Sequence, residues 1–381
     1  MRQRSLLKLF AVGGILLFFV VVLTVGRSSA LAPQGNPSAE WRRSRHANRD
    51  TAVAEATVER RGTGAAHCGR CHSEQGFIAW VPQLLAGDPG FIKKPDGSAA
   101  DEAYLRSLGL TTDRVQPITC RTCHGDDFQM RIRDNTPMLP AGFEAWAVGQ
   151  GAICMTCHNT RNDRIKWDAA DPGRYTAPHY SAEADVIMGK NAFFLDDTVN
   201  GASPHGLFVG DSCVTCHLTL GKDGHTFQAS ETSCVSCHGP SMTIEFVQKP
   251  IETLLEQVKA AIERRILAVR DQIGVVRRWD PATGAYTENF PLDGRQIRKL
   301  AEIRSIGGLI SFRFTLADGT EVYARAGEIW DRPGGRRIFA TSDPIIRASW
   351  NYLLIKYDGS LGVHNPSFAR NVLLATLRAL R

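Results

Sequence analysis

The sequence contains no cysteine outside one repeated pattern. All ten cysteines of the 381-residue chain fall in five copies of Cys-x-x-Cys-His, so none is left over for another structural role. After residue 32 there is also no apolar run long enough to cross a bilayer, which excludes a polytopic membrane protein. With 43% hydrophobic residues the chain is not disordered, and its length suffices for one large or two ordinary domains.

The sequence has little net charge once its first 32 residues are set apart. Three basic residues precede an apolar run at 9–25, and Ala-Leu-Ala at 30–32 fits a signal peptidase site. We expect residues 1–32 to be a signal peptide with a mature start near Pro33. Because the apolar run is long, an uncleaved N-terminal membrane anchor is the alternative. Removing these residues lowers the formal charge from +6 to +2, so no nucleic-acid partner is expected.

The repeated pattern occurs five times between positions 68 and 238, and we number the copies motifs 1 to 5. The motifs are Cys68-x-x-Cys71-His72, Cys120-x-x-Cys123-His124, Cys154-x-x-Cys157-His158, Cys213-x-x-Cys216-His217 and Cys234-x-x-Cys237-His238. Two cysteines at this spacing share one short helical turn, so both thiols can add across the vinyl groups of one haem. The next histidine then lies under the iron, and the sequence therefore predicts five covalently bound haem c groups.

Three other interpretations explain the pattern less well. Zinc ribbons use paired Cys-x-x-Cys but do not require a histidine after every second cysteine. A disulfide scaffold fits an exported chain, yet it leaves the five histidines unexplained. Thioredoxin-like redox pairs do not come in fives. Haem attachment also fits the leader, because thioether formation takes place on reduced, unfolded chains outside the cytoplasm, and the leader has no twin-arginine pair.

Six histidines lie outside the motifs, while five irons each need a second axial ligand. The six are His46, His67, His179, His205, His225 and His364. Bis-histidine ligation at every haem would use five of them. We expect His179, His205, His225 and His364 to be ligands, and on spacing alone His46 and His67 compete for the fifth position. Met188 could also ligate an iron, but we expect it to pack in the apolar interior.

The chain divides by composition after motif 5. The five motifs occupy 171 residues, about 34 per haem, which is too few for an ordinary side-chain core. We therefore expect residues 33–245 to form a pentahaem core in which the porphyrins supply most of the buried apolar surface. The fold class is mainly α, with loops wrapped around a stack of haems and a small antiparallel β section near the C-terminus.

Residues 246–381 have periodic patterns of their own. Pro250 is expected to open a helix that Gly274 ends, and Asp318-Gly319 to turn a β-hairpin. Two helices follow, at 345–356 and 366–380, the second capped by Asn365 with Pro366 as its first residue. If His364 ligates a haem, this region packs back on the haem core.

Several stretches carry a family resemblance. They are WRRSRHA ahead of HCGRCHSEQGF, SPHGLFVGDSCVTCH with GHTF and SCVSCHG, and NYLLIKYDGSLGVHNPSFARNVLL. In them the sequence resembles the multihaem (pentahaem) c-type cytochromes related to the cytochrome c nitrite reductase and hydroxylamine oxidoreductase group. The resemblance implies that His46, His205, His225 and His364 are distal ligands, which favours His46 over His67. Nitrite reductases of that group typically carry Cys-x-x-Cys-Lys at the catalytic haem, and its absence here argues against nitrite reduction.

These features favour an electron-transfer protein over an enzyme. Haems with two histidine ligands cannot bind substrate at iron but can pass single electrons between redox protein partners. The alternatives are a reductase or oxidoreductase of a small nitrogen or sulfur compound with one open haem, and a subunit of an extracellular cytochrome filament. The expected location is periplasmic or extracellular. No catalytic residue is assigned, and the oligomeric state is left open.

Overall fold

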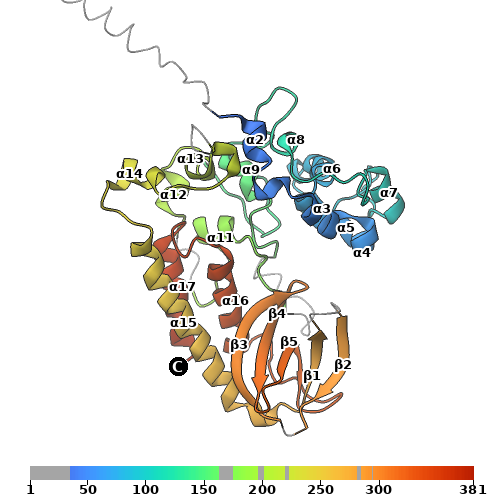
Figure 1. Cartoon of the computed structure of the whole chain (residues 1–381), viewed down its shortest axis with the longest axis vertical. Helices are drawn as coiled ribbons and strands as arrows, with labels where there is room; N and C mark the ends of the chain where they lie inside the picture. Colours follow the sequence, from blue (N-terminus) through green and yellow to red (C-terminus); the bar gives the residue numbers. More distant parts are fainter. Residues whose placement is uncertain (1–34, 163–174, 196–200, 219–222, 281–284, 294) are drawn as a thin grey trace, which may run out of the picture.

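The computed structural model describes residues 35–162, 175–195, 201–218, 223–280, 285–293 and 295–381. In Figure 1 the short helices up to α14 form one part of the molecule, and the long helix α15, helices α16 and α17 and a β-sheet form the other. The expected leader, residues 1–32, lies outside the described residues. Within them, no helix combines the length and the apolarity needed to cross a membrane.

Each Cys-x-x-Cys pair lies at a short helix, as the spacing predicts. These helices are α5 (Ala65–His72), α8 (Cys120–Cys123), α9 (Gly151–Met155), α13 (Cys213–His217) and α14 (Thr232–His238). Helix α9 ends just before Cys157, which follows in a turn. Thr119 caps α8 by accepting a hydrogen bond from the Arg121 N–H (3.2 Å). In every motif the two cysteines are three positions apart at one short helical segment, so they lie about one turn apart whether or not a side chain caps the helix.

The other elements before α15 are also short. They are α2 (Pro37–Trp41), η1 (Arg45–Ala47), α3 (Arg49–Ala56), α4 (Val58–Arg61), η2 (Gly62–Gly64), α6 (Glu74–Leu85), α7 (Glu102–Ser107), α11 (Glu183–Ile187), α12 (Pro204–Leu207) and η3 (Gly224–Thr226). Helices α5 and α6 pack so closely that a Cβ on Gly76 would lie 2.3 Å from the Gly69 carbonyl oxygen. Gly76 therefore allows the contact that supports motif 1.

An ordinary side-chain core exists around motif 1, contrary to our expectation for this stretch. Phe77, Trp80, Leu84, Leu105 and Leu110 are buried together there. The expectation that haems would supply most of the buried surface is wrong around motif 1, because α6 has an apolar face there. The average composition of the whole stretch does not reveal this face. By contrast, no hydrophobic side chain is buried among the described residues from 201 to 250, which carry motifs 4 and 5.

The long helix α15 (Glu245–Ala268) begins five residues before the expected start. Pro250 lies inside it, where the missing proline N–H leaves only the carbonyl of the exposed Phe246 without its helical partner. The helix also ends before the expected stop, and η4 (Arg270–Gln272) follows. Gly274 instead permits a close backbone approach, since a Cβ there would lie 2.0 Å from the Asp331 carbonyl oxygen.

The β section is a five-stranded antiparallel sheet, larger than the one hairpin expected. Its strands are β1 (Val275–Asp280), β2 (Ala285–Pro291), β3 (Ile297–Ile306), β4 (Leu309–Leu316) and β5 (Glu321–Trp330), in the order β2-β1-β5-β4-β3. The expected hairpin is β4–β5, in which Thr315 pairs with Glu321 around Gly319 at φ +85°. The sheet packs against α15 and α16, with Phe312 and Phe314 in the shared core.

Two helices, α16 (Pro344–Tyr357) and α17 (Pro366–Ala379), close the chain within a residue or two of the expected bounds. Asn365 caps α17 by accepting a hydrogen bond from the Phe368 N–H (3.2 Å), as predicted. Its amide also donates to the Val186 carbonyl (3.1 Å), close to motif 3. The start of α17 is thus attached to the segment at 175–195.

Asn351 on α16 links that segment to α17. Its Oδ1 accepts from the Phe193 N–H (2.8 Å), and its amide donates to the Phe193 carbonyl (2.8 Å) and the Thr376 hydroxyl (2.9 Å). Asn351→Leu removes these three buried hydrogen bonds, so we expect chemical denaturation to show a loss of about 2–5 kcal/mol of unfolding free energy. The control Thr253→Val, on the exposed side of α15, should change it by less than about 0.5 kcal/mol. Equal effects would contradict the assigned role.

Asp185 on α11 gives a pH-dependent prediction. Burial raises its pKa from the ordinary 3.8 to about 7, although Asn191 and Thr160 hydrogen-bond to it. At a pH between the ordinary pKa of 3.8 and the folded-state pKa of about 7, the folded protein keeps a proton that the unfolded chain has released. The unfolding free energy therefore falls as the pH rises through this range. Asp185→Asn should remove it, so the difference in unfolding free energy between the two proteins should change across this window. Parallel pH profiles would contradict the assignment.

Candidate functional site

The histidines of the motifs lie opposite histidines from distant parts of the chain. Ring centroids are 6.0 Å apart for His72 and His179, 6.1 Å for His158 and His46, 6.2 Å for His217 and His364, and 5.9 Å for His238 and His205. Burial lowers the pKa of His225, and the fifth motif histidine, His124, lies near enough for its charge to lower that pKa further. We name each pair after its motif, as sites 1 to 5.

The separation of the paired rings matches what one metal ion between two imidazoles requires. With metal–nitrogen bonds of about 2 Å on opposite sides of one ion, the ring centres lie about 6 Å apart. The four measured separations all fall between 5.9 and 6.2 Å. Each pair also has two cysteines one turn before its motif histidine, so the donor set fits a covalently attached haem with two axial imidazoles.

The second ring nitrogen of most of these histidines is held by the protein. Nδ1 of His124 lies 2.8 Å from the Phe128 carbonyl, that of His217 lies 3.0 Å from the Phe227 carbonyl, and that of His205 lies 3.1 Å from the Val363 carbonyl. Such partners fix Nδ1 as the protonated nitrogen and leave Nε2 as the donor to a metal.

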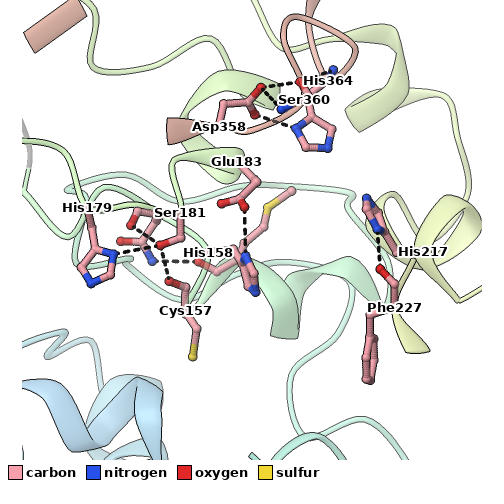
Figure 2. Close-up of polar contacts among 12 residues, drawn as sticks. Cys157, His158, His179, Ser181, Glu183, His217, Phe227, Asp358, Ser360 and His364 are labelled. Carbon is pink, nitrogen blue, oxygen red and sulfur yellow. Dashed lines mark hydrogen bonds and ion pairs between the residues drawn. The ribbon is translucent and has the colours of Figure 1, made fainter. Parts of the chain in front are cut away.

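Three more of these histidines have side-chain partners at Nδ1 (Figure 2). His364 lies 2.6 Å from an Asp358 oxygen, His158 lies 3.3 Å from a Glu183 oxygen, and His179 lies 3.3 Å from the Ser181 hydroxyl. Hydrogen bonds at the outer nitrogen are a regular feature of metal-binding histidines, because they set the ring orientation. No motif in the sequence distinguishes Asp358, Glu183 or Ser181 from other residues of their kind.

Burial keeps several of the imidazoles neutral, which is the form that binds metals. Burial lowers the pKa of His46 to about 4 and that of His179 to about 2. At two histidines, His364 and His158, the pKa is raised instead. At His364 burial also acts to lower the pKa, but the Asp358 carboxylate outweighs it and raises the pKa to about 9. Glu183 likewise raises the pKa of His158 against the effect of burial.

The N-terminal segment provides the partner of His158. His46 lies in η1 and faces His158, whereas His67 packs against Phe91 at a ring separation of 4.5 Å and lies 3.4 Å from Arg70. The geometry therefore pairs His46, and not His67, with motif 3. Met188 is buried in the apolar core, as expected.

The cysteines show which sites are neighbours. The thiols of Cys71 and Cys157 are close enough to shift each other's pKa, as are those of Cys154 and Cys213, so motif 3 lies between motifs 1 and 4. Burial raises the pKa of Cys216 and the nearby charge of Cys234 raises it further, so motif 5 lies next to motif 4. A Cβ on Gly151 would lie 3.0 Å from the Cys213 nitrogen, so this glycine allows motifs 3 and 4 to approach. All ten cysteines lie in the described segments, and none is disulfide-bonded.

Phe227 connects three of the sites. Its ring lies 4.5 Å from His46 and 6.1 Å from His225, and its carbonyl lies opposite Nδ1 of His217. Its backbone has a positive φ of 60°, which is uncommon for a bulky residue. One strained aromatic residue therefore contacts ligand candidates of sites 2, 3 and 4, a role that no sequence pattern signals.

Comparison with known proteins returns one distant structural similarity. No family model matches the chain, and no curated protein matches it. A solved structure, described as the crystal structure of the outer cell wall cytochrome OcwA, aligns with a TM-score of 0.46 and 17% sequence identity. The alignment covers 91% of this chain and 50% of that one, so this chain spans half of that protein's length.

Glu40 on α2 holds the loop that carries His225. The carboxylate is buried and accepts hydrogen bonds from the Asp223 and His225 N–H groups, both at 3.0 Å. Glu40→Ala leaves these two donors without acceptors, so we expect a loss of about 1–3 kcal/mol of unfolding free energy. Hydrogen exchange of the two amides should also become faster than in the intact protein.

The control for this prediction is Glu55→Ala, which removes a carboxylate that pairs with Arg61 near the surface. It should cost less than about 1 kcal/mol and leave the exchange of the Asp223 and His225 amides unchanged. If Glu40→Ala left that exchange unchanged as well, Glu40 would not be what holds the loop.

Proposed function

We propose that this protein is a multihaem cytochrome c that carries electrons through five closely spaced haems between redox protein partners outside the cytoplasm. The ten motif cysteines would attach the haems, and His72, His124, His158, His217 and His238 would be the proximal ligands. His179, His225, His46, His364 and His205, in the same order of sites, would be the distal ligands. When bound, each haem would supply reversible one-electron chemistry at its iron.

The observation that carries this proposal is the pairing of the histidines at metal-bridging distance. Four of the five motif histidines face a distal histidine at nearly the same separation, although the partners come from unrelated elements. Ordinary packing of imidazole rings does not require a constant distance. A metal ion shared by each pair of histidines does require such a constant distance.

In electron transfer the protein would hold the sites close together and would fill both axial positions of each iron. Motif 3 adjoins motifs 1 and 4, and motif 4 adjoins motif 5, which supports a continuous path along sites 1, 3, 4 and 5. A neighbouring thiol and burial raise the pKa of both motif 3 cysteines, and the charge of Cys123 raises both further, so site 2 would branch from the middle of this path. Iron with two imidazole ligands has no open position for a substrate, which favours electron transfer over catalysis.

Low-temperature EPR of the oxidised protein, integrated against haem content, tests this proposal. We expect all five ferric haems to be low-spin. His46→Ala should convert one of the five to high-spin, because site 3 loses its distal ligand. The matched control His67→Ala removes a neighbouring histidine and should leave all five low-spin.

The same measurement separates the second candidate function. If about one haem in five is high-spin in the unaltered protein, one site is open, and reduction of a small nitrogen or sulfur compound becomes the better assignment. If His67→Ala rather than His46→Ala produced the high-spin signal, the assigned ligand of site 3 would be wrong.

A further inference from the structure

The Nδ1 partners of the ligand histidines are of two chemical kinds. At sites 2 and 5 the hydrogen-bond acceptors are the neutral carbonyls of Phe128 and Val363, and at site 1 the partner is the Ser181 hydroxyl. At sites 3 and 4 the partner is a carboxylate: a Glu183 oxygen lies within hydrogen-bond distance of Nδ1 of His158, and an Asp358 oxygen lies within that distance of Nδ1 of His364. Glu40 is also near a ligand candidate, but it lies 3.9 Å from Nδ1 of His225 and is engaged with backbone N–H groups.

Asp358 is placed as a fixed charge. Its side chain has no solvent exposure, and one oxygen lies 2.6 Å from Nδ1 of His364. The other oxygen accepts hydrogen bonds from the Ser360 hydroxyl and from the Ser360 N–H at 3.3 Å. The Ser360 hydroxyl oxygen also accepts from the His364 N–H (3.1 Å), so the carboxylate and the histidine are held in one small network (Figure 2).

Glu183 lies beside His158 of the neighbouring site 3 (Figure 2). One of its oxygens lies 3.3 Å from Nδ1 of His158, and its second oxygen is buried without a hydrogen-bond partner among the described residues. Its charge also acts to raise the pKa of His364, on which Asp358 has the larger effect. Motifs 3 and 4 are in contact, since a Cβ on Gly151 would lie 3.0 Å from the Cys213 nitrogen, so two carboxylates serve two adjacent sites in the middle of the proposed path.

We propose that Asp358 and Glu183 are positioning residues that make sites 3 and 4 the haems with the lowest reduction potentials in the chain. A carboxylate that accepts the Nδ1 proton raises the basicity of the imidazole and places a negative charge near the iron. Both effects stabilise the ferric over the ferrous state, and the low dielectric of a buried site strengthens them. Carbonyl and hydroxyl partners at the other sites exert a weaker effect.

The consequence is an uneven distribution of electrons in the partly reduced protein. Electrons would reside at sites 1, 2 and 5, where a redox partner can exchange them, and would only pass through sites 3 and 4. This inference rests on the proposed function, because it requires a bis-histidine haem at both central sites.

The test is a redox titration of the complete holoprotein followed by optical spectra and EPR, in the unaltered chain and in Asp358→Asn. The asparagine keeps the size and an oxygen acceptor but removes the charge. We expect the reduction equilibrium of one of the two lowest-potential haems to shift about tenfold towards the reduced form, which is about 59 mV for one electron, while all haems stay low-spin. The ring planes of site 3 are 87° apart and those of site 4 are 49° apart, so their EPR signals should differ and identify the haem that moves.

Glu183→Gln is the second variant and should shift the site 3 haem in the same direction. The control Ser360→Ala removes a neighbour of Asp358 but keeps the charge, so its shift should be clearly smaller than that of Asp358→Asn. If neither carboxylate variant moved a potential, or if the haems that moved were not the lowest two, the inference would be overturned. A high-spin haem in the unaltered protein would count instead against the proposed function, so the two failures are distinguishable.

Discussion

The arrangement of this protein depends on pairs of imidazoles held about 6 Å apart. Sites 1, 3 and 4 each join a motif to a segment remote in the sequence, such as η1 at the N-terminal side or the loop before α17. Around motifs 4 and 5 no described hydrophobic side chain is buried, so side-chain packing cannot hold this region together. Coordination of a shared metal would therefore act there as the main tertiary contact.

The five motifs and the candidate second ligands could be identified from the sequence because they depend on local spacing and on a count of histidines. The Cys-x-x-Cys-His pattern fits one helical turn whatever surrounds it, and the count of remaining histidines limited the second ligands to six. The helices α16 and α17 were also predictable, since Asn365-Pro366 is a cap signal that acts within one turn. On spacing alone His46 and His67 could not be separated, and only the position opposite His158 distinguishes them.

What could not be predicted was decided by contacts between distant segments. Helix α15 continues through Pro250 because the affected carbonyl faces solvent, and three of the five strands have no hairpin signal of their own. Contacts between distant segments also determine which residues surround the ligand histidines. Asp358, Glu183, Glu40 and Phe227 are ordinary residues in the sequence and gain their roles only because the fold places them beside a ligand histidine.

The long separation of the paired histidines has a consequence for folding. Sites 1, 3 and 4 join histidines more than a hundred positions apart, whereas His205 and His238 of site 5 are close in sequence. Loop-closure entropy favours the short connection, so site 5 should acquire its correct ligand first. If the sites hold haems as proposed, the distant sites of a chain with six non-motif histidines would have to reject wrong imidazoles before the native ones arrive. Misligation would then be an obstacle to folding in addition to the formation of the two hydrophobic cores.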